Sequence, residues 1–171
     1  MDPQTFNRNR LVELDELLEL EYEKRHEFEK EITLADGPTQ KIALRQRIKH
    51  ELIPRLRKLE QEYAKQLVAG SEQLVVPEGE AEALVVSLIS AVAHTRANPP
   101  SNAPQEMLTL LEETRKQLAE PGKTAAAKLK ITLPIVPLLA SYEMELDTEK
   151  FVTQVWQRTR EFFKHLISRP K

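Results

Sequence analysis

The tetrapeptide Ala35-Asp36-Gly37-Pro38 separates an acidic segment from a basic one, and this junction decides the fold. Residues 11–35 hold nine acidic and three basic side chains, whereas residues 38–67 hold eight basic and three acidic ones. Gly37 can adopt the left-handed conformation that ends a helix, and Pro38 suits the start of the next helix. We therefore expect two helices that fold back as an antiparallel hairpin with complementary faces.

The composition of the 171-residue chain is typical of amphipathic helices. Hydrophobic residues make up 40% and charged residues 30%, while only 5% are aromatic and four are glycine. The formal net charge of −2 gives no bulk attraction to nucleic acid. Cysteine is absent, which excludes disulfides, thiolate metal sites and cysteine nucleophiles.

The N-terminal sequence shows no charged region followed by an apolar core, so no signal peptide is recognisable. The longest strongly apolar stretch, residues 133–140, contains two prolines and is too short to span a bilayer. Together with the lack of cysteine, these features favour a cytoplasmic location.

Hydrophobic spacing and helix-breaking residues predict the order of the helices. The first helix covers about 5–34, and its apolar stripe (Leu11, Leu14, Leu18, Phe28, Ile32) is interrupted by Glu21 and Arg25. The second covers 38–67 and is kinked or split at Pro54, which has no N–H to donate to His50. Further helices are expected over 77–97 and 104–119, the former as the central buried helix.

Residues 123–146 are compatible with two conformations. Leu129, Ile131, Leu133 and Ile135 alternate with polar residues or proline, which is strand periodicity, but the prolines exclude a central strand. We favour a helix ending near Leu133 and a proline bend into 138–146, and a short edge strand over 129–135 is the alternative. Asp147 or Thr148 can cap the last helix.

The predicted fold class is therefore all-α. We expect a charged helical hairpin over 1–70 and a small helical domain over 71–171 that ends in an amphipathic basic helix.

The residues indicate no reaction chemistry. Gly122-Lys123-Thr124 matches the end of a phosphate-binding loop, but Gln117 stands where that loop needs its first glycine, and no strand precedes it. Glu23 and His26 have the Glu-x-x-His spacing of di-metal bundles, yet no second such pair follows. We expect no catalytic, metal or cofactor site.

Two surfaces are candidates for partner binding. In the hairpin, the candidate residues are Arg45, Arg47, Arg57, Glu16 and Glu23. In the last helix, Phe151, Trp156, Phe162 and Phe163 oppose a basic face, which suits a core position, a partner groove or an anionic membrane surface. Nucleic-acid binding by the second helix is disfavoured, because the first helix matches its charge and Tyr63 is its single aromatic residue.

Two stretches resemble a known family. The first is Asp36-Gly37-Pro38-Thr39-Gln40-Lys41-Ile42-Ala43-Leu44-Arg45-Gln46-Arg47-Ile48, continuing to Leu59-Glu60-Gln61-Glu62-Tyr63. The second is Lys128-Leu129-Lys130-Ile131-Thr132-Leu133-Pro134-Ile135-Val136-Pro137, with Ser141-Tyr142-Glu143 and Asp147-Thr148-Glu149. They resemble cyanobacterial multidomain signalling and conflict proteins, whose helical hairpins are similar to effector-associated modules beside STAND-type NTPases, caspase-like peptidases and TIR domains.

The resemblance implies a stand-alone, non-enzymatic adaptor. It would recruit a protein with a similar helical module, or a second copy of itself, through helix–helix contacts. The alternative is a peripheral membrane protein that uses the last helix.

Overall fold

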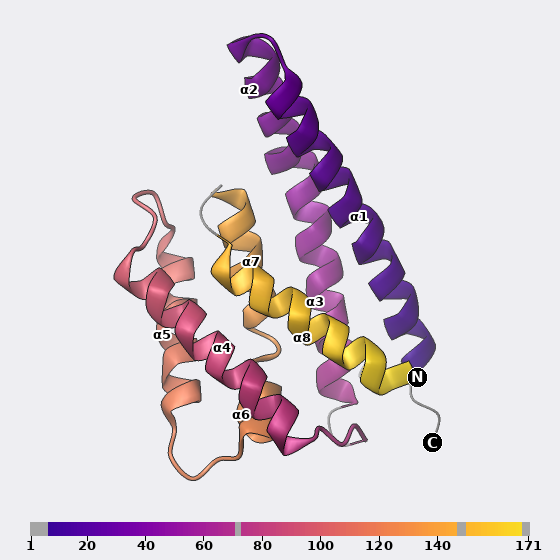
Figure 1. Cartoon of the computed structure of the whole chain (residues 1–171), viewed down its shortest axis with the longest axis vertical. Coiled ribbons are helices and arrows are strands. Elements are labelled where there is room, and N and C mark those ends of the chain that lie inside the picture. The colour runs from indigo at the N-terminus through magenta and orange to yellow at the C-terminus, as the bar shows by residue number, and fades with distance from the viewer. Residues whose placement is uncertain (1–6, 71–72, 147–149, 169–171) are drawn as a thin grey trace.

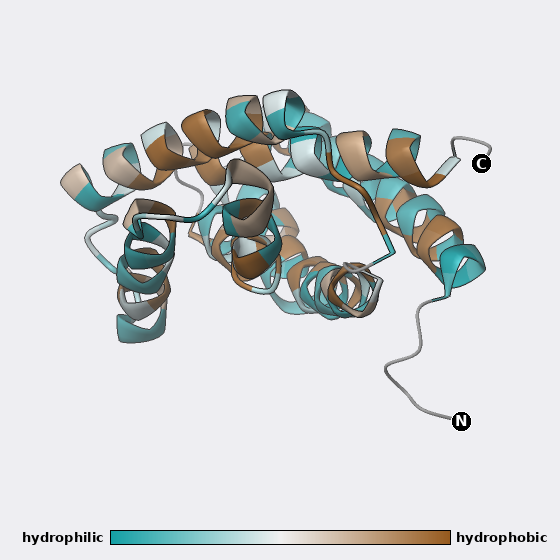
Figure 2. Ribbon diagram, turned by 90° about the horizontal axis from the view of Figure 1, so that it is seen from below, coloured by the Kyte–Doolittle hydropathy of each residue, from teal (hydrophilic) through white to brown (hydrophobic). Residues whose placement is uncertain are grey.

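The computed structural model describes residues 7–70, 73–146 and 150–168, and over these ranges the fold is all-α, without strands (Figure 1). The elements are α1 (Arg8–Leu34), α2 (Pro38–Arg47), the π-helix η1 (Ile48–Leu52), α3 (Ile53–Ala69), α4 (Glu78–Ala97), α5 (Gln105–Ala119), α6 (Ala125–Thr132), α7 (Val136–Glu145) and α8 (Phe151–Ser168). Hydrophobic and hydrophilic residues alternate along the helices, which is the pattern of amphipathic packing (Figure 2).

The contact between α1 and α3 is mainly apolar. Figure 1 shows α3 running back beside α1 after α2. Leu11, Leu14 and Leu18 of α1 are buried, as are Leu56 and Leu67 of α3. Burial of each such side chain contributes about 2 kcal/mol, more than an exposed ion pair does.

The ion pairs between α1 and α3 have both polarities. Arg10 of α1 lies 2.7 Å from Glu62 of α3, and Glu21 of α1 lies 3.9 Å from Arg55 of α3. In the first of these pairs the anion comes from the basic segment, opposite to the polarity that the charge pattern predicts.

The turn between α1 and α2 differs from the expected one. Gly37 is extended (φ −141°) and precedes α2, whereas Ala35, also extended, follows the end of α1 at Leu34. The prediction of a left-handed Gly37 was therefore wrong, and Pro38 begins α2 as expected.

Pro54 splits the second predicted helix. Immediately before it, the Ile53 N–H donates to the Ile48 carbonyl, five residues back, which is the π-helical pattern of η1. Pro54 has no N–H, so it cannot make the α-helical hydrogen bond to the carbonyl four residues earlier. The wider π-helical turn shifts the hydrogen-bond register at this point, and α3 begins at Ile53.

The helix expected to be central, α4, is exposed along one face. Val86 and Ile89 have 61% and 44% of their surface exposed, so the prediction of α4 as the central buried helix was wrong for this side of the helix. The helix α8 contacts α4, α7 and α1 and carries the fully buried Trp156. A largely apolar stretch such as residues 84–89, in which Ser87 is the single polar residue, does not by itself show which of its sides will be covered.

Residues 123–146 form two helices, as favoured, and not the edge strand. α6 and α7 meet at an angle of 54°, and Pro137 lies in the first turn of α7. Thr124 caps α6 by accepting a hydrogen bond from the Ala127 N–H. The Glu78 carboxylate, from α4, accepts the Ala125 and Ala126 N–H groups at 2.7 and 3.2 Å.

The first three amides of α6, which follow Gly122-Lys123-Thr124 and would face a phosphate bound at this helix N-terminus, are therefore already bonded within the protein. Gly122 has φ +83° and forms the turn between α5 and α6.

Buried side chains from both sides of residue 70 share one core cluster. At the start of α8, Glu143 of α7 accepts the Val152 and Thr153 N–H groups at 3.0 and 2.7 Å. The Glu143 carboxylate therefore caps the N-terminus of α8. The predicted caps, Asp147 and Thr148, lie outside the described residues.

Candidate functional site

A buried polar cluster joins α1, α3 and α8. Glu60 of α3 accepts hydrogen bonds from the Tyr22 hydroxyl and the Trp156 indole N–H, both at 2.5 Å. Burial raises the pKa of Glu60 to about 7. The Arg160 guanidinium, which opposes that rise, is hydrogen-bonded to Asp15 and Glu19, each at 3.0 Å.

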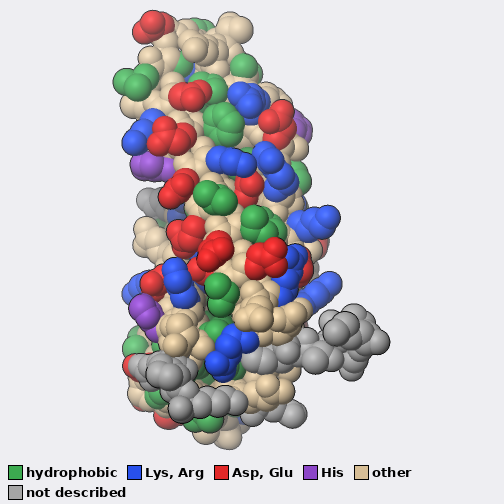
Figure 3. All heavy atoms as spheres, turned by 90° about the vertical axis from the view of Figure 1, so that its right-hand side faces the viewer, with side chains coloured by type: hydrophobic (Ala, Val, Ile, Leu, Met, Phe, Trp, Pro, Cys, Tyr) green, Lys and Arg blue, Asp and Glu red, His purple; other side chains and the backbone are tan. Residues whose placement is uncertain are grey.

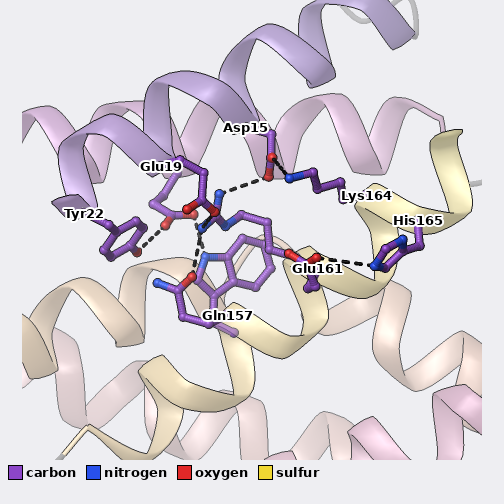
Figure 4. Close-up of polar contacts among 10 residues, drawn as sticks. Asp15, Glu19, Tyr22, Gln157, Glu161, Lys164 and His165 are labelled. Atoms are coloured by element: carbon purple, nitrogen blue, oxygen red, sulfur yellow. Dashed lines mark hydrogen bonds and ion pairs between the residues drawn. The ribbon is translucent and has the colours of Figure 1, made fainter.

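Figure 4 shows how this cluster is completed from α8. Asp15 also lies 3.3 Å from Lys164, and the two side chains point toward each other across the α1–α8 contact (Figure 4). Asp15, Glu60 and Arg160 are all buried, so the cluster is an internal anchor and not an open site. Its role is structural, because its hydrogen bonds and ion pairs hold α8 against α1 and α3.

The aromatic residues of α8 are divided between core and surface. Trp156 and Phe163 are buried, so in this conformation they are core residues that contact neither a partner nor a membrane. Phe151 and Phe162 are half-buried, and their ring centroids lie 4.1 Å from His94 and 5.3 Å from Phe163. Of the three roles that the sequence allowed, the structure supports the core role for Trp156 and Phe163.

The predicted hairpin residues are in different environments. Arg57 points to α7, donates to Glu145 at 2.7 Å and to Ser141 at 2.9 Å, and stacks on Tyr142. Arg47 is exposed and lies over the Phe28 ring. Arg57 is therefore an internal bridge between α3 and α7.

Glu16 and Glu23 are exposed on α1. The face of the molecule on which α1 lies carries acidic, basic and apolar side chains interspersed (Figure 3). Such a surface has no field of a single sign over long distances, so recognition here depends on local contacts.

A groove of about 500 Å³ opens among α1, α2, η1, α3 and α7, and we call it the basic-rimmed groove. Its apolar lining residues are Ile32, Ile42, Ile48, Ile53 and Met144. Its charged lining residues are Arg25, Glu29, Arg45, Lys49 and Glu145. The first four elements come from the predicted hairpin, and α7 closes the groove on one side.

Two cations of the basic-rimmed groove are unpaired. Arg25 lies 2.9 Å from Glu29, and Glu145 is held by Arg57, so these charges are compensated. The exposed side chains of Arg45 and Lys49 have no hydrogen-bond or ion-pair partner among the residues that the structure describes. The groove therefore combines an apolar surface with an excess of positive charge.

The sequence predicted only Arg45 of this groove. Lys49 lies four residues after it, and Ile42 and Ile48 lie beside them in sequence, which is a mixed basic and apolar pattern. That pattern could have been recognised from the sequence. The contribution of Met144 and Glu145 could not, because these residues are distant in sequence from the rest of the groove.

Among the described residues, no group of three or more His, Asp or Glu side chains is arranged to hold a metal ion. In those ranges, no single helix has the length and apolar composition to cross a membrane, and α6 and α7 reach it only as a bent pair.

Comparison of the chain with protein-family models, curated proteins and solved structures found no match. The resemblance to effector-associated hairpin modules therefore stays a prediction made from the residues alone.

Proposed function

We propose that this chain is a non-enzymatic adaptor whose basic-rimmed groove binds an acidic amphipathic helix of a partner protein. The observation that carries the proposal is the pair of unpaired cations, Arg45 and Lys49, beside an apolar lining. The resemblance described above favours a signalling or defence system as its setting.

The expected binding mode is that of a helix in a groove. A partner helix with apolar residues at positions i, i+3, i+4 and i+7 would cover Ile42 and Ile48, while its flanking carboxylates would meet Arg45 and Lys49. Apolar burial supplies most of the affinity, and the rim charges supply specificity and a faster association rate. Binding should therefore weaken with salt, because exposed charges are screened over about 8 Å at physiological ionic strength.

The test measures binding of a labelled acidic amphipathic peptide by fluorescence anisotropy. The double variant Arg45→Glu/Lys49→Glu should weaken the peptide affinity by about tenfold or more, since it replaces two attractions with two repulsions. The matched control is Lys58→Glu/Lys65→Glu, which makes the same change of charge at exposed positions of α3 outside the groove.

Circular dichroism should show the same helix content in both double variants. Equal loss of affinity in the two double variants would mean that only the net charge matters, which would contradict the proposal. The proposal would also be contradicted if the wild-type chain did not bind the peptide saturably.

The membrane alternative stays a prediction. It relied on the aromatic residues of α8, of which Trp156 and Phe163 are buried. Flotation with anionic vesicles at low salt tests it directly, and it would need Phe151 and Phe162 to make the contact.

A further inference from the structure

A second groove, of about 550 Å³, lies between α1 and α8 and shares no lining residue with the basic-rimmed groove. We call it the acidic groove. Its apolar lining residues are Leu11, Val12, Leu20 and Ile167. Its other lining residues are Asp15, Glu16, Glu19, Tyr63, Lys164, His165 and Ser168.

The net charge along this groove is negative, although the Lys164 side chain is also half exposed. Asp15 is buried and is neutralised by Arg160 and Lys164. Glu19 shares Arg160 with Asp15 but remains half exposed, and Glu16 is exposed without a partner among the described residues. Two cations thus face three carboxylates, and the uncompensated charge lies on Glu16.

The exposed residues of the acidic groove lie in one line along α1. Val12, Glu16 and Leu20 are spaced by four residues, which places them on one helix face over about 12 Å. Val12 and Leu20 have 48% and 54% of their surface exposed. An apolar, an acidic and an apolar side chain therefore follow one another along an uncovered surface.

The lining of the acidic groove also includes a buried polar group without a partner. Tyr63 is 1% exposed, and its hydroxyl makes no hydrogen bond with any of the described residues. A buried hydroxyl left unpaired is unfavourable in free energy, because it has lost its hydrogen bonds to water without replacement. A bound segment that brings a hydrogen-bonding group to this position would recover that energy, so Tyr63 distinguishes this groove from an ordinary apolar depression.

We propose that the acidic groove is a second docking site, and that it takes a basic amphipathic helix of a partner protein. The complementary segment carries an apolar residue, a Lys or Arg four positions later, and a second apolar residue four positions after that. Its cation pairs with Glu16, and its apolar residues cover Val12 and Leu20. The chain then joins two partners of opposite charge through separate grooves.

The experiment uses the full chain and two labelled helical peptides of equal length and identical apolar positions. One peptide carries Lys and the other Glu at the flanking positions, and anisotropy gives each affinity. Glu16→Lys should weaken the Lys peptide by about tenfold and leave the Glu peptide unchanged. The matched control, Glu31→Lys, makes the same change at an exposed position of α1 that lines neither groove.

Each result favours or overturns the proposal. Selective loss in Glu16→Lys supports it, and a further loss in Leu20→Ser would place the apolar contact on the same line. Equal weakening by Glu16→Lys and Glu31→Lys, or no saturable binding of the Lys peptide to the wild type, overturns it. The Arg45→Glu/Lys49→Glu variant should keep the Lys peptide, so that failure of the first groove and failure of the second are told apart.

Discussion

Glu60 is a carboxyl group in a position where an apolar residue would be expected. It follows Leu56 by four residues and precedes Tyr63 and Leu67 on the buried face of α3. Its two hydrogen bonds come from neutral donors, Tyr22 and Trp156. A protonated carboxyl also fits both partners. Its carbonyl oxygen can accept from the Trp156 indole N–H, and its O–H can donate to the Tyr22 hydroxyl, which is able to accept as well as donate.

The stability of the protein should fall as the pH rises from about 4.5 to 7. Burial raises the pKa of Glu60 from 4.5 to about 7, so the folded chain binds this proton more tightly than the unfolded chain. The stabilisation from the proton on Glu60 is present in full below pH 4.5, the pKa in the unfolded chain. It is lost as the pH rises through about 7, the pKa in the folded chain. The difference amounts to roughly 3 kcal/mol. Urea unfolding at pH 5 and pH 8 measures it.

Glu60→Gln should flatten this pH dependence, because the amide can accept from Trp156 and donate to Tyr22 without ionising. Burial also raises the pKa of Glu143, so a smaller dependence of the same sign should remain. Glu31→Gln, at an exposed position, is the control and should behave as wild type. An unchanged slope in Glu60→Gln would show that Glu60 is not the titrating group.

The sequence contains part of this result at the residue scale. A charged residue on the apolar stripe of a helix predicts a buried polar contact, and Glu60 could have been found that way. Its partner Trp156 could not, since the two residues are 96 positions apart and no periodicity links them. The same reason explains why Arg57 was assigned to a surface although it binds Glu145.

At the scale of elements, the start of α6 shows how two helices are joined by one carboxylate. Glu78 lies in the first turn of α4 and accepts the free N–H groups of Ala125 and Ala126. An anion at a helix N-terminus is favoured by the unpaired amides and by the helix dipole. Glu78 therefore serves the N-terminal ends of both α4 and α6.

Glu78→Ala should destabilise the fold by about 1 kcal/mol, the usual cost of losing a cap. Thr124 still caps the Ala127 N–H, which limits the loss. Thermal unfolding measures the effect. Glu80→Ala is the matched control, because it removes an exposed acidic residue from the same turn of α4. If both variants lost equal stability, the contribution would come from the α4 dipole and not from the contact with α6.

Element boundaries were largely predictable because the chain marks them with proline and glycine. Pro38, Pro54 and Pro137 each lie in the first turn of a helix, and Gly122 forms the turn before α6. The favoured two-helix arrangement of 123–146 was confirmed. The side of α4 that would be covered was not predictable, because apolar residues surround much of that helix.

At the scale of the whole molecule, buried and partly buried polar contacts cross residue 70. The Glu60–Trp156 hydrogen bond, the Asp15–Arg160 ion pair and the Arg57–Glu145 ion pair all link the first 70 residues to the rest. The division into 1–70 and 71–171 was made from charge and composition, which describe segments and not their packing. It stays a prediction about domains, and these contacts argue for cooperative unfolding.

Urea unfolding should therefore give one transition by every probe. Trp156 is the single tryptophan, and it lies in α8 against Glu60 and Tyr63 of α3, so its fluorescence reports the contact between the two segments. Far-UV circular dichroism reports all the helices together. Because the segments share one buried cluster, the two transitions should have the same midpoint. A fluorescence change that is complete before most of the helix signal is lost would contradict this and would support independent domains. The result also decides how docking should be understood, since in a cooperative unit a partner bound in either groove stabilises the whole chain.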